Sequence, residues 1–149
     1  MRIGRSMKLV YELEIAGLEY NPVPYKRTTQ RAKFMSGDYE RYREWKIFLG
    51  DKFCVQNERA AKEIYEVFNK KTKRREIHMR PRLSGAYFVE TVATYKDKTH
   101  GDTDNVAKGV NDALFADDKY VSGSYEFQYG KSGGIIVKIY EIDGEFKES

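Results

Sequence analysis

Several features common in other protein classes are scarce in this sequence of 149 residues. It holds one cysteine, Cys54, so an intramolecular disulfide and a cysteine-based zinc site are both excluded. No apolar stretch approaches the length of a membrane span, and no charged-then-apolar leader starts the chain. The 40% apolar and 14% aromatic content is too high for a disordered chain. We therefore expect one soluble cytoplasmic domain over residues 1–149, large enough to bury a core.

Charge is abundant but unevenly distributed. The net charge is +4, yet residues 70–82 carry seven Lys or Arg and one Glu, and residues 22–46 carry seven Lys or Arg and three acids. Residues 101–118 show the reverse, with five acids and one lysine. A basic surface attracts a phosphodiester backbone, and an acidic cluster within it can hold a metal ion. This distribution favours a metal-dependent nuclease, although a basic soluble protein of another kind has a similar composition.

The acidic segment has the periodicity of a helix. Its apolar residues recur on one face, at Val106, Val110, Ala113 and Leu114. Its charged residues line a different face, at Asp104, Lys108 and Asp112. Asp102 stands where an N-cap is expected, and Asp117 and Asp118 follow where the helix should end. The segment therefore predicts a helix with carboxylates at both ends.

Repulsion between these acids suggests a bound cation. Carboxylates within about 4–6 Å of one another raise each other's pKa unless a cation lies among them. Oxygen ligands of this kind suit Mg²⁺ or Mn²⁺. A calcium loop does not fit, because Val106 and Ala113 occupy positions that would have to supply ligands. The alternative is a solvated acidic face with a capped start, and composition alone favours neither interpretation.

The combination of motifs resembles the RusA family of Holliday junction resolvases. The matching residues are Asp102-x-Asp104-Asn105-x-x-Lys108, then Asp112-Ala113-Leu114, then Asp117-Asp118. The resemblance implies a homodimer that makes paired nicks in four-way DNA junctions with divalent metal. It also implies catalytic roles for four residues, of which the three aspartates bind the metal: Asp102, Asp104, Lys108 and Asp118.

Two departures from that family stand out. The family usually has a basic residue or proline before its first aspartate, and this chain has Gly101. The family also has about six or seven residues between Asp-Ala-Leu and Asp-Asp, whereas this chain has only Phe115 and Ala116. The shortening leaves open whether Asp117 or Asp118 faces the metal.

Basic residues before the first predicted helix are candidates for DNA contacts. Alternation predicts a strand from Lys8 to Ile15, followed by an irregular loop over residues 17–33. The resembled family has a similar loop near its active site, so we expect three loop residues to contact phosphates: Lys26, Arg27 and Arg31. A helix is predicted from Ser36 or Asp38 to about Leu49, ended by Gly50-Asp51.

A second helix is predicted from Asn57 to about Asn69, as part of an insertion over about residues 56–75. The basic run that closes it is a candidate DNA clamp through Lys73, Arg74 and Arg75. The lone His78 that follows is a weak ligand signal.

The remaining elements predict a small mixed sheet. Residues 86–95 are apolar on both faces, which favours a central strand that delivers the chain to the acidic motif. Residues 120–129 and 135–142 alternate around a glycine-rich turn and predict a C-terminal antiparallel hairpin. The expected fold class is α+β, RusA-like, with helices packed against the sheet.

These observations favour a metal-dependent endonuclease, and the resemblance implies that it is a structure-specific endodeoxyribonuclease. One or two Mg²⁺ or Mn²⁺ ions would be held by Asp102, Asp104 and one of Asp117 or Asp118, and Lys108 would stabilise charge on the reacting phosphate. Asp112 is expected to pair with Lys108. The alternative is a module that binds junctions or DNA without catalysis, with a structural acidic helix. A third interpretation, a metal-dependent transferase, lacks the expected nucleotide-binding βαβ framework.

Overall fold

The fold is a mixed α+β arrangement of two sheets and two helices in the residues that the structure, a computed structural model, describes, which are 6–27 and 37–142. The elements in chain order are β1 (Met7–Leu18), α2 (Gly37–Gln56), β2 (Lys62–Asn69), β3 (Arg74–Pro81), β4 (Tyr87–Tyr95), α3 (Thr103–Leu114), β5 (Val121–Tyr129) and β6 (Gly133–Ile142). The predicted strand at Lys8–Ile15, the strand at 86–95 and the helix of the acidic motif are confirmed. In this described part, neither helix is long and apolar enough to cross a membrane.

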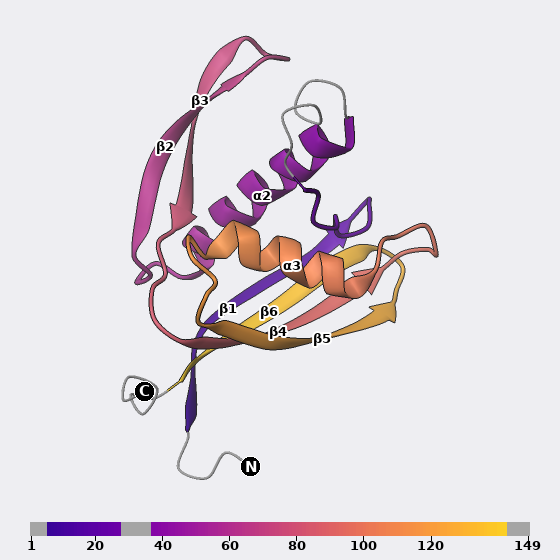
Figure 1. The fold of residues 1–149 in the computed structure, drawn as a ribbon. Helices are drawn as coiled ribbons and strands as arrows, with labels where there is room; N and C mark the ends of the chain where they lie inside the picture. The colour runs from indigo at the N-terminus through magenta and orange to yellow at the C-terminus, as the bar shows by residue number, and fades with distance from the viewer. Residues whose placement is uncertain (1–5, 28–36, 143–149) are drawn as a thin grey trace.

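The main sheet has four strands in the order β1-β6-β4-β5. β4 lies inside it, antiparallel to β6 and parallel to β5, as its two apolar faces predicted. Helix α3 connects β4 to β5, and such a crossover is what a parallel pair requires. Both helices lie over the same face of this sheet (Figure 1).

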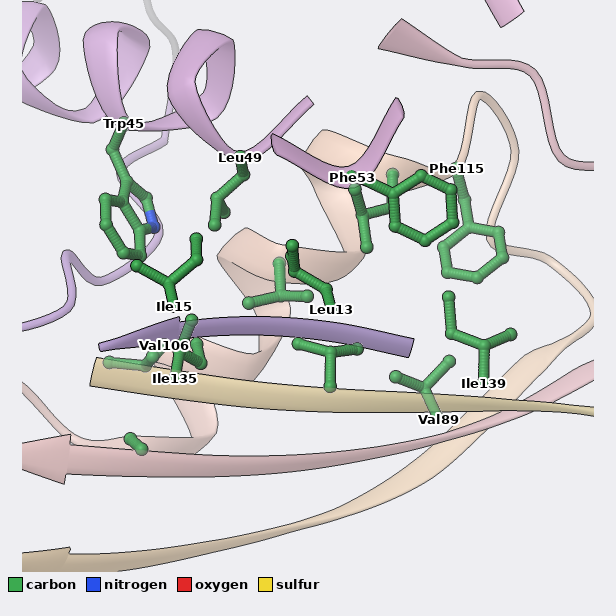
Figure 2. Close-up of a cluster of buried hydrophobic side chains, with 14 of the residues drawn as sticks. Leu13, Ile15, Trp45, Leu49, Phe53, Val89, Val106, Phe115, Ile135 and Ile139 are labelled. Carbon is green, nitrogen blue, oxygen red and sulfur yellow. The ribbon is translucent and has the colours of Figure 1, made fainter. Parts of the chain in front are cut away.

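The core fills the space between that face and the two helices (Figure 2). Alternate residues of the strands point into it, because successive side chains of a strand lie on opposite faces. Trp45, Leu49 and Phe53 come from α2 and meet Leu13 and Ile15 of β1, and all five are at least 93% buried. Val106, Val110 and Leu114 of α3 are fully buried, which confirms the predicted apolar face of that helix.

Helix α2 is longer than the sequence predicts. It continues through Gly50 and Asp51 to Gln56. A Cβ atom at position 50 would lie 3.0 Å from the carbonyl oxygen of Met79, so the glycine allows β3 to pass close to the helix. Asp51 accepts a hydrogen bond from the backbone N–H of Met79 at 2.7 Å. The prediction that Gly50-Asp51 ends the helix was wrong because these residues serve a tertiary contact.

The helix predicted from Asn57 to about Asn69 was also wrong. Residues 62–81 form an antiparallel hairpin, β2 and β3, that packs on α2 and extends away from the main sheet (Figure 1). The apolar spacing of Ile64, Val67 and Phe68 fits a helix, but the segment is rich in β-branched and aromatic residues, which favour strands. The basic run lies at the turn and the start of β3, where Lys73 adopts a left-handed conformation with φ of 59°.

The predicted C-terminal antiparallel hairpin was wrong as well. Both strands exist, but β4 lies between them, so β5 and β6 do not pair. The turn after β5 crosses the end of β4, where the N–H of Gly130 donates to the carbonyl of Tyr95 at 2.9 Å. Strand alternation carries no information about which strand is the neighbour, so the sequence could not distinguish this topology from a hairpin.

Candidate functional site

The acidic motif begins on a well-held loop. Lys96–Gly101 connects β4 to α3, and Asn21 binds this loop from the segment after β1. The Asn21 side-chain amide donates to Asp97 Oδ1 at 2.9 Å and to the carbonyl of Thr99 at 2.8 Å, and its oxygen accepts from the N–H of Lys96 at 2.8 Å. Hydrogen bonds from Asn21, Lys96 and the backbone of Thr99 lower the pKa of Asp97. The entrance to α3 is therefore fixed by contacts from a distant part of the chain.

Asp102 occupies the N-cap position of α3 without using its side chain as a cap. Its backbone is extended, with φ of −67° and ψ of 141°, and its carbonyl accepts from the N–H groups of Asn105 and Val106 at 3.1 Å. An aspartate at this position usually accepts a backbone hydrogen bond through its carboxylate. Here no such side-chain bond forms. The carboxylate of Asp102 is exposed and available to another partner.

Asp104 lies in the first turn of α3 and is also exposed. Its Oδ1 accepts a hydrogen bond from the N–H of Asn105 at 2.8 Å. Among residues 6–27 and 37–142, no lysine, arginine or histidine forms an ion pair with Asp102 or Asp104. The two acids therefore form a pair of carboxylates without a protein cation, at a helix end that favours negative charge.

Three hollows meet around Gly101, which lines all of them. One, of about 620 Å³, is lined by Asp102 and Asp104 together with aromatic side chains of β5. Another, of about 360 Å³, is lined by Asp102 and by Lys26 and Arg41. The carboxylates thus lie between an aromatic surface and a basic one.

The absence of a side chain at Gly101, where the resembled family usually has a basic residue or proline, has a local physical reason. A Cβ atom at position 101 would lie 2.8 Å from Cγ of Pro24, which is closer than such atoms approach. The next residue, Tyr25, donates its backbone N–H to the carbonyl of Asn105 at 2.9 Å. The segment before α2 therefore packs directly on the start of α3 and leaves no room for a side chain at Gly101.

Lys108 points toward that same segment. Its Nζ lies 4.5 Å from the ring centre of Tyr25, a cation–π contact, and the side chain stays exposed. The expected pairing of Lys108 with Asp112 was wrong. Asp112 instead accepts hydrogen bonds from Lys46 Nζ at 3.0 Å and from the hydroxyl of Tyr42 at 2.6 Å, so it fastens α3 to α2.

Asp117 and Asp118 lie at the opposite end of α3. The helix has 12 residues and is about 18 Å long. Phe115 after it is buried and bridges to Leu83, and the two acids then precede the start of β5, which pairs with the start of β4. Asp102 and Asp104 follow the end of β4. One chain therefore does not bring the four carboxylates together.

No group of three or more His, Cys, Asp or Glu side chains that could hold a metal ion occurs within the described ranges. The metal roles of the four aspartates remain predictions. The Asp102–Asp104 pair alone fits Mg²⁺, because this ion usually keeps several waters and takes one or two protein carboxylates together with substrate phosphates. Asp117 and Asp118 are not part of that donor set within one chain.

The predicted DNA-binding residues occupy two separate surfaces. Lys26 lies beside the hollow at Asp102 and also 4.0 Å from Asp38, and Arg27 is exposed next to it, whereas Arg31 lies outside the described residues. The predicted clamp lies on the β2–β3 hairpin at Lys73, Arg74 and Arg75. Neither strand of that hairpin lines any of the three hollows at Gly101.

Sequence reasoning missed the aromatic cluster beside the carboxylates. The ring of His100 stacks on Tyr95 with centres 3.6 Å apart, and Phe127 and Tyr129 surround it. The Nδ1 of His100 lies 2.8 Å from the carbonyl of Gly101 and so donates to it, while Nε2 lies 2.8 Å from the hydroxyl of Tyr129. The alternation of aromatics in β5 was visible in the sequence, but its position next to Asp102 depends on the fold.

No protein-family model matches this chain, and no curated protein matches it either.

Proposed function

We propose that this protein is a metal-dependent endodeoxyribonuclease that cuts branched DNA, with four-way junctions as its substrate and a homodimer as its active form. The observation that supports this most directly is the free carboxylate of Asp102 at the N-cap of α3, next to that of Asp104. An acid used only to cap the helix would bond the exposed backbone N–H groups. The motif resemblance adds the expectation of a resolvase.

Asp102 and Asp104 would hold the metal ion. A bound divalent ion supplies charge neutralisation at the phosphate and activation of water for phosphodiester hydrolysis. The loop fastened by Asn21 and the packing of Pro24 on Gly101 hold the backbone that carries the two carboxylates. Such preorganisation matters because the reacting groups must be positioned before the reaction begins.

The chain's own cations would orient the substrate. Lys26 and Arg41 line the hollow on one side of Asp102, where they attract the phosphate backbone. Lys108 lies one helical turn from Asp104, and its ammonium group is exposed above Tyr25. From there it can bind a phosphate oxygen and stabilise the charge that accumulates during hydrolysis.

The test is incubation of the protein with a labelled four-way junction, a linear duplex and a flap, in Mg²⁺ or Mn²⁺. We expect the junction to be nicked and the duplex to remain intact. Asp104→Asn should lower cleavage by about 100-fold or more while junction binding persists, because it removes a ligand to the catalytic ion. Glu58→Gln, which neutralises an exposed acid in the loop after α2, is the matched control and should cleave normally. A folded protein that cuts none of the substrates contradicts the proposal.

The second candidate is a DNA-binding module without catalysis. The observation in its favour is that Asp102 lies at the N-cap and Asp104 in the first turn of α3, where acids stabilise a helix through its dipole. Calorimetric titration with Mn²⁺ distinguishes the two. A nuclease should bind the ion through Asp104 and lose that binding in Asp104→Asn, whereas a module should bind junctions equally well with and without Mn²⁺.

A further inference from the structure

The second half of β5 carries aromatic side chains that lie on the helix side of the main sheet but are not covered by a helix. β5 is the outermost strand of that sheet and pairs with β4 (Figure 1). Phe127 lies beside Ala93 of β4, which is fully buried in the core under the helices. Its ring and that of Tyr125 therefore lie on the same side as α3. Yet Tyr125 is 53% and Phe127 55% exposed.

The hollow of about 620 Å³ between these rings and the start of α3 has two chemically different walls. Tyr125 and Phe127 form an aromatic wall, and Asp102 and Asp104 form an acidic one. Its volume is within the range of ligand pockets, about 300–1,000 Å³. A ligand that fills it must present an apolar ring to one wall. To the other it must present polar groups that accept the carboxylates or a metal ion held by them.

The ring of Phe127 is held in position by other rings. It lies edge-on to Tyr129 with ring centres 5.8 Å apart, and its centre is 6.3 Å from that of His100. His100 is itself fixed, since it stacks on Tyr95 and its Nε2 lies 2.8 Å from the hydroxyl of Tyr129. A ring that is supported by its neighbours and still more than half exposed offers a preorganised stacking surface.

A basic hollow continues on the other side of Asp102. It is lined by Lys26 and Arg41, and it shares Gly101 and Asp102 with the aromatic hollow. Sites for single-stranded nucleic acid combine these two features, a positively charged groove along the backbone and aromatic rings on which bases stack. The order of basic groups, carboxylates and aromatic rings therefore fits successive parts of one strand: a phosphate, the phosphate to be cut and a base.

We propose that the hollow between β5 and α3 binds an unstacked nucleobase of the DNA strand, on the ring of Phe127 and next to Tyr125. The base belongs to the nucleotide beside the phosphate that is cut at Asp102 and Asp104. A nucleobase fits better than an apolar side chain of a protein, because its ring stacks on Phe127 while its polar edge faces the carboxylates. The position of the cut rests on the proposed function, whereas base binding in the hollow does not.

Base binding in this hollow distinguishes branched DNA from a linear duplex. In a duplex both faces of each base are covered by its neighbours, so a base reaches Phe127 only after it has left the stack. The cost of leaving the stack is lowest for a nucleotide that is already unpaired. The hollow therefore selects DNA with an unpaired nucleotide beside the cut. It accepts any of the four bases, because each has an aromatic face.

Binding is tested with a fluorescein-labelled oligothymidine of about eight nucleotides, in the Asp104→Asn background so that nothing is cut. We expect Phe127→Ala to weaken binding about tenfold, as the loss of one stacking ring does, and Phe127→Trp to restore it. Phe68→Ala is the matched control and should bind normally, because this ring on β2 is 54% exposed and lines none of the hollows at Gly101. Equal binding by Phe127→Ala overturns the proposal, as does a parent chain that binds no oligothymidine.

Contact with the base is tested by replacing one thymine with 5-iodouracil, which cross-links on irradiation to an aromatic side chain stacked on it. Mass spectrometry should find the cross-link at Phe127 or Tyr125. This measurement keeps the native rings of β5, so it does not depend on whether a Phe127 variant folds. A cross-link found only on the β2–β3 hairpin, or no cross-link at all, overturns the assignment of the base to this hollow.

The position of the base relative to the cut is tested with the native chain and Mg²⁺. A junction that lacks the base beside the cut phosphate should be cut about tenfold more slowly than an intact junction. Phe127→Ala should cut the intact junction equally slowly and lose nothing further on the abasic one, because both changes remove the same contact. Additive losses, or normal cutting of the abasic junction, overturn this position. A native chain that cuts no junction but binds oligothymidine through Phe127 contradicts the proposed function and leaves the base site intact.

Discussion

The imidazole of His78 lies 2.6 Å from Oδ2 of Asp51 and joins the hairpin to α2. Its other nitrogen lies 3.0 Å from Oε1 of Glu76, so the ring bridges two carboxylates. Burial alone would lower the pKa of His78, but the hydrogen bonds with Glu76 and Asp51 outweigh it and raise the pKa above its ordinary value. His78, a weak ligand signal in the sequence, therefore fastens the two-stranded sheet to the main body.

The His78 bridge predicts a specific pH dependence of stability. Because the pKa is higher in the folded protein, the stabilisation is fully present below the unfolded value near 6.5 and is lost as pH rises through the folded value. His78→Gln should lower the free energy of unfolding by about 1–2 kcal/mol at pH 6 and by less at pH 9. Urea denaturation at several pH values measures this. A difference between the proteins that grows with pH would contradict the bridge.

The two acids of the α3 charged face should behave differently on substitution. Asp112→Asn removes the ion pair with Lys46, which is partly exposed, and so should cost no more than about 1 kcal/mol of stability. It should leave Mn²⁺ binding and cleavage unchanged, because Asp112 faces α2. Asp104→Asn should leave stability nearly unchanged and abolish both Mn²⁺ binding and cleavage. Calorimetric metal titration and thermal denaturation of both variants measure these effects, and equal metal binding by the two would remove Asp104 from the site.

Gly101→Ala should impair activity more than stability. The added methyl group would meet Pro24 at 2.8 Å and push the segment before α2 away from the start of α3. We expect a cost of about 1–2 kcal/mol in unfolding free energy and roughly tenfold slower cleavage, since a displacement near 1 Å disturbs positioning. Gly37→Ala, where an added Cβ meets nothing within 4 Å, is the control. Normal cleavage by Gly101→Ala would contradict the expectation that the contact between Pro24 and Gly101 positions the carboxylates.

Removing the side-chain amide of Asn57, which hydrogen-bonds the backbone of the edge strand β1, should make the protein aggregate. Asn57→Ala deletes the bonds to Glu12 and exposes the backbone of an edge strand. We expect a loss of about 1–3 kcal/mol in stability and a concentration-dependent rise in light scattering, because unprotected edges pair with other chains. Glu58→Gln at the neighbouring exposed position should scatter no more light than the native chain. Destabilisation without added scattering would contradict the protective role.

Local patterns were sufficient where one face of an element is buried. The apolar positions of α3, the alternation of β1 and the two apolar faces of β4 each predicted the element found. The periodicities of 3.6 and 2 follow from backbone geometry and require no knowledge of the neighbouring elements. The pair of aspartates at the start of α3 was therefore visible as a candidate site before any fold was considered.

Tertiary structure decided everything that depends on which elements are neighbours. Gly50 looked like a helix terminator but accommodates β3, and residues 62–69 became a strand because they pair with β3 and pack on α2. Because β4 lies between β5 and β6, these two strands do not form the hairpin that the sequence predicted. The same topology placed Asp117 and Asp118 at one end of α3 and Asp102 and Asp104 at the other, because a parallel crossover returns the chain to the start of the sheet. Hydrophobic pattern determines which side chains are buried, but strand order and the grouping of distant carboxylates arise from contacts between segments far apart in the chain.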